Sequence, residues 1–177
     1  MKQIFTQTIH VPTIEGLFIL SYTTLGLVSL AFPFTPALKL KKFKFTPKNS
    51  LEKDFYADLN NYFLGKVISW NYPLDLSAHT PFQKEVWQAL QKISYGKIKT
   101  YKEIAIKLNR PRSFRAVGNA CSKNPLPIII PCHRVVKKNY NLGGFSSGLI
   151  WKEKLLRIEK SNDRILNLNN YSFSKSS

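Results

Sequence analysis

The sequence predicts an α/β part at the N-terminus, residues 1–76, followed by a mainly α-helical part, residues 77–160. Three observations predict this division. Before residue 35 the apolar residues alternate with polar ones or form short runs, as in strands, whereas from residue 80 onward they follow a helical spacing behind marked helix starts. Positive charge is concentrated in the second part. A chain of 177 residues is long enough for two small domains.

The first part is expected to contain two or three strands. Their patterns lie at Gln3–Val11 and Gly16–Phe32, with a turn at residues 23–26. A Lys-rich stretch, residues 39–48, is expected to be a loop. No constellation of catalytic side chains is visible here, so this part is interpreted as a scaffold.

One helix completes the first part. Asn49 or Ser50 can cap it, and it is expected to run to Gly65 because apolar residues recur every four positions. Glu52 completes an Asn-x-x-Glu capping box, in which side chains and backbone groups at the helix start satisfy each other. Strands and helix together predict a small α/β domain.

Two capping boxes mark helix starts in the second part. Thr80 and Gln83, with a proline at the first helical position between them, open a helix whose apolar face ends at Gly96. Thr100 and Glu103 open a shorter helix that ends at about residue 108. Both boxes precede regularly spaced apolar residues, which favours helices that pack on a common core.

A tight turn, residues 109–112, follows the second of these helices, and Ser113 then caps a third helix, residues 114–122. Two short helices joined by a turn, the second rich in small residues, are typical of a helix-turn-helix. An ordinary helical hairpin in a core shows the same pattern. A last helix is expected over Leu149–Glu159, and the Asn/Ser-rich residues 161–177 are expected to be disordered.

The formal net charge of +17 is unevenly distributed. Residues 80–160 contain 17 Lys and Arg against 4 Asp and Glu, whereas residues 1–79 contain 8 against 5. A stripe of cations crosses the two short helices and their turn, with Glu103 as the one acidic residue among them: Lys97, Lys99, Lys102, Lys107, Arg110, Arg112 and Arg115. Such a stripe is often only a solvated face, but its coincidence with the helix-turn-helix pattern favours binding of nucleic acid.

Composition also excludes several classes of protein. Two cysteines, Cys121 and Cys132, provide neither a disulfide framework nor a zinc quartet. The N-terminus lacks the apolar stretch of a signal peptide, and the longest apolar run, residues 25–34, is too short to cross a bilayer. We therefore expect a reduced intracellular compartment and no contact with a membrane.

Cys132 is the candidate nucleophile. It lies in the string Pro-Cys-His-Arg-Val, residues 131–135, directly after the apolar run 126–130, which is predicted to be a short buried strand. A thiol held rigidly beside His133 is how proteins present a nucleophile. For an isolated pair, the commoner interpretation is a small buried cysteine beside an ordinary surface histidine. The flanking motifs decide against that interpretation.

In chain order, these motifs are Tyr95-Gly96-Lys97, Thr100-Tyr101, Arg115-Ala116-Val117-Gly118, Asn124-Pro125-Leu126-Pro127, Ile130-Pro131-Cys132-His133-Arg134-Val135 and Gly144-Phe145-Ser146. Together they resemble the O6-alkylguanine-DNA alkyltransferases, also called methylated-DNA-protein-cysteine methyltransferases, from about Pro73 to Glu159. The resemblance implies an RNase-H-like sheet in the first part. It also implies a monomer that acts on double-stranded DNA containing O6-alkylguanine, in the cytoplasm or, in a eukaryote, the nucleus. Whether O4-alkylthymine is also a substrate is left open.

The resemblance implies that Cys132 accepts the alkyl group in a reaction that each chain performs once, because a thioether is not hydrolysed. His133 would act on the thiol through a water molecule, since neighbours on an extended chain point to opposite faces. Glu159 would orient the imidazole, and Asn124 would hold the turn at the cysteine.

Further roles follow from the same resemblance. Arg115 would fill the space left by the extruded nucleotide, and Tyr101 would crowd its phosphate and contact the guanine edge. The guanine site would be completed by Val135, Gly143, Ser146 and Lys152. No metal and no cofactor are expected. Phe145 and Ser147 depart from the commonest family residues, tyrosine and glycine, so acceptance of bulky alkyl groups is left open.

Two other functions are compatible with parts of this pattern. One is a non-catalytic reader of alkyl lesions of the alkyltransferase-like type, against which the presence of Cys132 argues. The other is a thiol hydrolase that uses Cys132, His133 and Glu159, which would leave the basic helical pair without a purpose.

Overall fold

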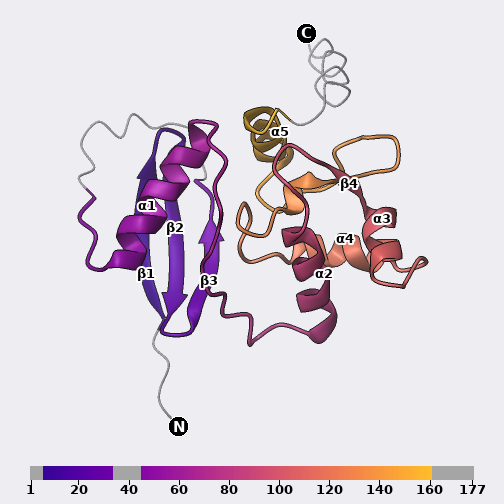
Figure 1. Cartoon of the computed structure of the whole chain (residues 1–177), viewed down its shortest axis with the longest axis horizontal. Helices are drawn as coiled ribbons and strands as arrows, with labels where there is room; N and C mark the ends of the chain where they lie inside the picture. The colour runs from indigo at the N-terminus through magenta and orange to yellow at the C-terminus, as the bar shows by residue number, and fades with distance from the viewer. Residues whose placement is uncertain (1–5, 34–44, 161–177) are drawn as a thin grey trace. The chain divides into compact units, whose positions relative to one another are not determined.

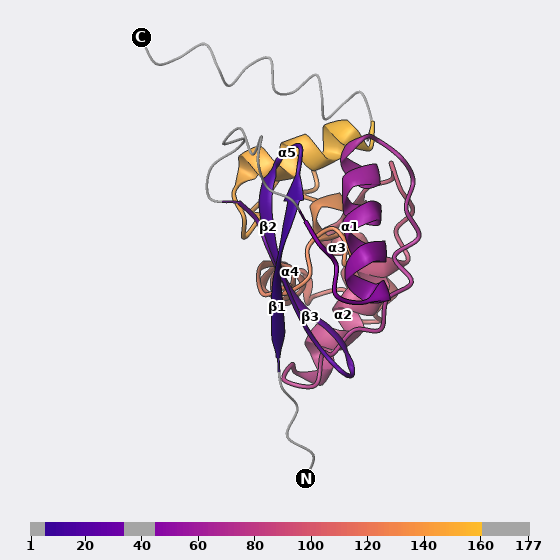
Figure 2. The ribbon, with the colours of Figure 1, turned by 90° about the vertical axis from the view of Figure 1, so that its left-hand side faces the viewer.

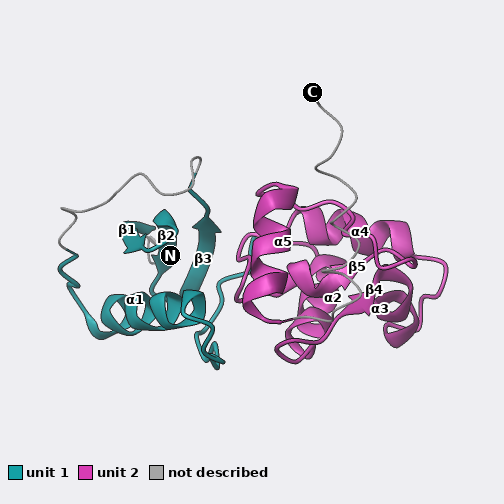
Figure 3. Ribbon diagram, turned by 90° about the horizontal axis from the view of Figure 1, so that it is seen from above, with its two compact units in different colours: residues 1–78 teal, residues 79–177 magenta. Residues whose placement is uncertain are grey.

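The computed structural model describes residues 6–33 and 45–160. The chain divides into two compact units, Met1–Ala78 and His79–Ser177 (Figure 3). Most of the Lys-rich stretch expected to be a loop lies outside the described residues, and so does the whole of the tail, residues 161–177, expected to be disordered.

Unit 1 contains a three-stranded antiparallel sheet in the order β1-β2-β3 (Figure 1). Its strands are β1 (Gln7–Thr13), β2 (Gly16–Thr23) and β3 (Gly26–Ala31). Buried and half-buried residues alternate along most of β2, with Phe18 and Leu20 fully buried. This alternation is the period of two that a sheet with one covered face requires. The predicted turn at residues 23–26 and the strands on either side of it are confirmed. The first predicted strand, Gln3–Val11, is confirmed only from Gln7 and continues to Thr13, and its first three residues lie outside the described part of the chain.

Helix α1 (Ser50–Phe63) forms a second layer against one face of this sheet (Figures 2 and 3). Asn49 caps it, accepting the Glu52 N–H at 2.9 Å. The predicted capping box is only half made, because the Glu52 carboxylate turns inward. That carboxylate accepts the Lys48 N–H at 2.7 Å and the Tyr22 hydroxyl at 2.7 Å. Glu52 thereby fastens the start of α1 to β2.

The end of unit 1 runs beside β3. Leu27 donates its N–H to the Pro73 carbonyl at 2.8 Å, and its own carbonyl accepts the Asp75 N–H at 2.8 Å. The Thr23 hydroxyl donates to the Asp75 carboxylate at 2.9 Å. These bonds occupy backbone groups that would otherwise form an exposed sheet edge. Gly26 lies at the contact, with φ +147°.

Unit 2 is mainly helical. Its elements are α2 (Pro81–Gln91), α3 (Tyr101–Lys107), α4 (Phe114–Ser122) and α5 (Leu149–Ile158), a short 3₁₀ helix η1 (Cys132–Arg134), and the parallel pair β4 (Lys99–Thr100) and β5 (Val135–Val136). Helices α2, α3 and α4 pack on one another. The fully buried Trp87 on α2 donates its indole N–H to the Ala120 carbonyl on α4 at 3.0 Å.

The predicted helix starts are borne out to different degrees. Both capping boxes, at Thr80 and at Thr100, are complete. Ser113 occupies the cap position of α4 but makes no side-chain cap hydrogen bond, because its backbone is not in the extended conformation that aims a cap side chain at the helix. Helix α2 ends at Gln91, and the chain reaches Gly96 through a turn, with φ +70° at that glycine. In the described part of the chain, no helix is long and apolar enough to cross a membrane.

The contact at Gly26 generates a stability prediction. A Cβ built on Gly26 would lie 2.3 Å from the Pro73 carbonyl oxygen, so Gly26→Ala forces β3 and residues 73–75 apart. Gly65→Ala is a matched control because Gly65 also has positive φ, +81°, but open space around its Cβ. We expect about 1 kcal/mol of destabilisation for the control, from backbone strain alone, and more than twice that for Gly26→Ala. Urea unfolding measures both, and equal losses would contradict the proposed clash.

Candidate active site

Residues 126–130 form a tight turn, so the prediction of a short strand is wrong. Ile130 donates its N–H to the Leu126 carbonyl at 2.8 Å, and Ile128 has φ +77°. Pro127 and Pro131 have no backbone N–H to donate to a neighbouring strand, which disfavours a strand here. The run forms a turn instead, and its apolar side chains are buried. Cys132 follows at the start of η1, so it and His133 lie on a helical turn and not on an extended chain.

Asn124 holds the turn and the sulfur together. Its side-chain amide donates to the Ile130 carbonyl at 2.7 Å and to the Cys132 sulfur at 3.0 Å. Its side-chain oxygen accepts the Leu126 N–H at 3.0 Å. Because Asn124 and Cys132 are both buried, these bonds fix the sulfur in one position.

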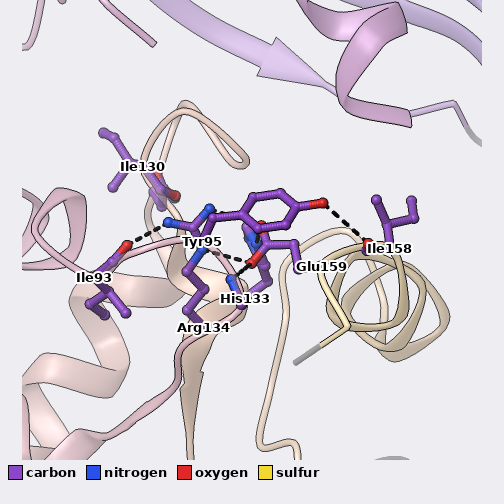
Figure 4. A network of polar contacts seen from close by, with 9 residues as sticks. Ile93, Tyr95, Ile130, His133, Arg134, Ile158 and Glu159 are labelled. Carbon is purple, nitrogen blue, oxygen red and sulfur yellow. Dashed lines mark hydrogen bonds and ion pairs between the residues drawn. The ribbon is translucent and has the colours of Figure 1, made fainter. Parts of the chain in front are cut away.

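Three charged or titratable side chains meet in a buried cluster, and two of them, His133 and Arg134, directly follow Cys132 in the chain (Figure 4). His133 Nε2 lies 2.8 Å from Glu159 Oε1. Arg134 makes two hydrogen bonds to the same carboxylate, at 2.9 Å and 2.8 Å, and Gly96 donates its backbone N–H to it at 3.2 Å. Glu159 is the residue at which α5 ends, so this cluster joins α5 to η1.

The cluster determines the protonation of the histidine. Burial lowers the pKa of His133, although the Glu159 hydrogen bond opposes the shift. The hydrogen bonds and charges of His133 and Arg134 lower the pKa of Glu159 to about 2, against the opposing effect of burial. The pair is therefore a neutral imidazole and a carboxylate at neutral pH. The imidazole donates from Nε2 to the carboxylate, which places its basic lone pair on Nδ1.

Burial raises the pKa of the Cys132 thiol to about 11. The hydrogen bond from Asn124 and the positive charge of Lys152 oppose this shift but do not cancel it. At neutral pH the resting cysteine is therefore a thiol. An appreciable amount of thiolate therefore forms at this pH only when a base takes the proton.

Four of the residues predicted to bind the base or the DNA come together. Tyr101 begins α3, and its hydroxyl lies close against Gly143. The space is so small that a Cβ at position 143 would be 2.9 Å from the Tyr101 hydroxyl oxygen. Lys152 is fully buried, lies 6.0 Å from the Tyr101 ring and donates to the Val135 carbonyl at 2.6 Å. Burial lowers the pKa of Lys152 to about 8 and raises that of Tyr101 to about 12. Both side chains thus keep their protons at neutral pH.

The other two predicted residues lie at the surface. Arg115 is exposed in the first turn of α4, and Ser146 is exposed in the segment between Gly144 and α5. Within the described residues, neither side chain is hydrogen-bonded to the group around Cys132. The same residues hold no group of three or more His, Cys, Asp or Glu side chains that could bind a metal ion.

Sequence reasoning missed Arg134 and Tyr95. Arg134 donates to the Ile93 carbonyl as well as to Glu159, and its guanidinium lies 5.8 Å from the Tyr95 ring. The Tyr95 hydroxyl donates to the Ile158 carbonyl at 3.1 Å. Both residues belong to motifs that the resemblance quotes, but only the fold shows that they enclose the carboxylate.

This combination defines a class of protein: a basic helical unit that holds a buried thiol next in the chain to a histidine–carboxylate pair. Comparison with known proteins identifies the class. A family model described as "6-O-methylguanine DNA methyltransferase, DNA binding domain" matches residues 81–161. The methylated-DNA-protein-cysteine methyltransferase of Methanosarcina barkeri is 46% identical over 132 residues, 72% of this chain and 83% of the relative.

Further relatives agree. The methylated-DNA-protein-cysteine methyltransferase of Haemophilus influenzae is 48% identical over 100 residues, 56% of this chain and 55% of the relative. The crystal structure of Mycobacterium tuberculosis OGT in complex with DNA matches with a TM-score of 0.72 at 35% identity, covering 88% of this chain and 92% of that one. The chain belongs to the methylated-DNA-protein-cysteine methyltransferase family.

The raised pKa of Cys132 generates a prediction about reactivity. Below pH 11 the thiolate fraction of the free protein rises about tenfold per pH unit, so the rate of Cys132 alkylation by iodoacetamide should rise similarly. In urea-unfolded protein, the alkylation rate of Cys132 should instead stop rising near the ordinary thiol pKa of about 8.5. Peptide mapping follows both rates. A native rate that levels off below pH 9 would contradict the assigned thiol state.

Proposed function

We propose that this protein repairs DNA by direct reversal, transferring an alkyl group from guanine O6 to Cys132. The observation that carries the proposal is the sulfur of Cys132, fixed by Asn124 at 3.0 Å, in a unit whose His133 is held by Glu159 at 2.8 Å. Family membership supports the reaction class, methylated-DNA-protein-cysteine S-methyltransferase. The substrate is double-stranded DNA containing the lesion, and the cytoplasm or a nucleus is where the protein would meet it.

The proposed reaction is an in-line displacement. The Cys132 proton passes, through a water molecule, to Nδ1 of His133, and the Glu159 carboxylate stabilises the imidazolium that forms. The sulfur forms a bond to the alkyl carbon as the bond from that carbon to O6 breaks, and the electron pair leaves with guanine. Because burial lowers the pKa of His133, the imidazolium is transient, and the guanine takes up the proton.

The pocket would act on the leaving base. We assign Val135, Gly143, Ser146 and Lys152 to the guanine site, where the Lys152 ammonium offsets negative charge on the departing guanine. The product is a thioether, which water does not cleave, so each chain reacts once.

DNA would reach this site through α3 and α4, which we interpret as a helix-turn-helix. Tyr101 would crowd the phosphate and contact the flipped guanine, and Arg115, exposed in the first turn of α4, would enter the stack in its place. The small residues of α4, Ala116 and Gly118 among them, would let its backbone approach the duplex closely, in the minor groove.

Unit 1 would serve as a scaffold. We retain residues 1–76 as the scaffold domain, with an RNase-H-like sheet, and residues 77–160 as the DNA-binding alkyltransferase domain of a monomer. The three antiparallel strands of unit 1 and the helix that covers them support the scaffold assignment.

The alternative functions are less well supported. A non-catalytic lesion reader has no use for a sulfur fixed by Asn124. A thiol hydrolase would not explain a family model described as a DNA-binding domain over residues 81–161.

A single-turnover assay tests the proposed function. Label from O6-methylguanine DNA should transfer to the protein and stop at one methyl group per chain. Cys132→Ala should abolish transfer while leaving DNA affinity within about threefold, and Cys121→Ala should retain transfer. Mass spectrometry locates the methyl group. Methyl on Cys121, DNA binding without transfer, or multiple turnover on an ester would each reject the mechanism.

A second comparison separates extrusion from chemistry. If Arg115 acts only while the nucleotide is flipped, Arg115→Ala should slow repair of duplex DNA at least tenfold but change the reaction with free O6-benzylguanine less than twofold. Rapid-quench kinetics on both substrates measure the difference. Equal slowing on both would instead place Arg115 in the pocket or in folding.

A further inference from the structure

Two adjoining hollows lie on unit 2, between the end of α2 and one side of α3. The larger, about 520 Å³, is lined by residues between Lys92 and Lys107. The smaller, about 450 Å³, shares Lys97, Lys99 and Glu103 with it and extends to Tyr140 and Lys160. We call the two together the lysine groove: the lining residues within 92–107, with Tyr140 and Lys160.

The groove is strongly positive. Its lining includes the side chains Lys92, Lys97, Lys99, Lys107 and Lys160. Among the residues that the structure describes, Glu103 is the one acidic side chain in the lining, and it is already engaged. Its carboxylate pairs with Lys99 at 2.8 Å and accepts the Thr100 N–H at 2.7 Å. The remaining ammonium groups therefore present uncompensated charge to a ligand.

The larger hollow of the groove also has an apolar part, formed by isoleucines, which we call its floor. Ile93 and Ile104 are buried beneath it, and the Ile106 side chain, 51% exposed, lies in the same lining as Lys92 and Lys107. Phosphates of a nucleic acid would use the ammonium groups but not this floor. A protein segment that alternates carboxylates with apolar side chains would use both.

The Lys- and Glu-bearing side of α3 that lines the groove differs from the side that carries Tyr101, although the lining also reaches Ile93 and Gly96, whose backbone groups bond to Arg134 and Glu159. The Tyr101 hydroxyl meets Gly143, whereas Glu103, two positions further along the same helix, lines the groove. Residues two positions apart on a helix do not share a face. A ligand in the groove therefore leaves the Tyr101 side of α3 accessible to DNA. Lys97, Lys99 and Lys107, grouped by sequence with a phosphate-attracting stripe, belong to this separate surface.

We propose that the lysine groove binds an acidic segment of a partner protein, whose carboxylates pair with the lysines and whose apolar side chains cover Ile106. The proposal goes beyond alkyl transfer, because no step of that reaction uses these residues. It provides a place where another protein could hold this one without competing for the damaged base.

Fluorescence anisotropy with synthetic probes tests the proposal on the full chain. The probe is a short fluorescein-labelled peptide of alternating aspartate and leucine. It should bind at least tenfold more tightly than a matched peptide of alternating aspartate and serine, and its affinity should fall as salt is raised. Equal affinity of the two peptides would overturn the proposal, because it would leave the apolar floor without a role.

Matched variants locate the binding. Lys92→Glu and Ile106→Ser should each weaken the aspartate–leucine probe at least fivefold while leaving single-turnover methyl transfer unchanged. The controls Lys84→Glu and Ile150→Ser make the same chemical changes outside the groove, at Ile150 on a side chain that is 74% exposed. Equal weakening by the controls would overturn the proposal. A competition with a single-stranded oligonucleotide gives the second overturning outcome. If the oligonucleotide displaces the probe, and if Lys92→Glu and Ile106→Ser weaken its own binding, the groove is a nucleic-acid site and the proposal is wrong.

Discussion

One buried carboxylate organises the reactive half of this protein. Glu159 lies at the end of α5, yet its partners come from η1 and from the turn at Gly96. Removing a charge from water costs several kcal/mol unless its oxygens are fully paired, and here a guanidinium, an imidazole and a backbone N–H pair them. This cluster therefore fixes the position of helix α5 against the cysteine turn, together with the hydrogen bond from Lys152 on α5 to the Val135 carbonyl. The same carboxylate then sets the tautomer of His133, so the requirements of folding and of proton transfer coincide in one group.

Features determined by neighbouring residues were predictable from the sequence. The strand pattern of β2, the cap at Asn49 and the boxes at Thr80 and Thr100 depend on a few adjacent positions, and all appear in the structure. The path of residues 126–130 was not predictable in this way. An apolar run of that length suits a strand or a buried turn equally, and here its prolines and the distant amide of Asn124 decide.

In the site, too, the sequence predicted some features and not others. The motif around Cys132 indicated which residues meet, because its residue types are specific, but not how burial alters them. The burial of Arg134 was not predicted, because nothing in a sequence marks a charged residue as buried. The carboxylate of Glu159, which comes from another element, is what allows the Arg134 charge to be buried. Likewise, the cations between residues 97 and 115 are indistinguishable in sequence. The fold assigns some to the groove beside α3, pairs Arg110 with Glu85 at 3.0 Å and leaves Arg115 exposed on α4.

The protonated state of Cys132 has a consequence for a reagent that can be used only once. A thiolate exposed to the cell would be lost to oxidants and stray electrophiles long before a lesion was found. With its pKa near 11, the buried sulfur is almost entirely protonated at neutral pH, and a protonated thiol reacts slowly with oxidants and electrophiles. The chemical lifetime of an idle molecule is therefore governed by the same burial that shapes its pocket.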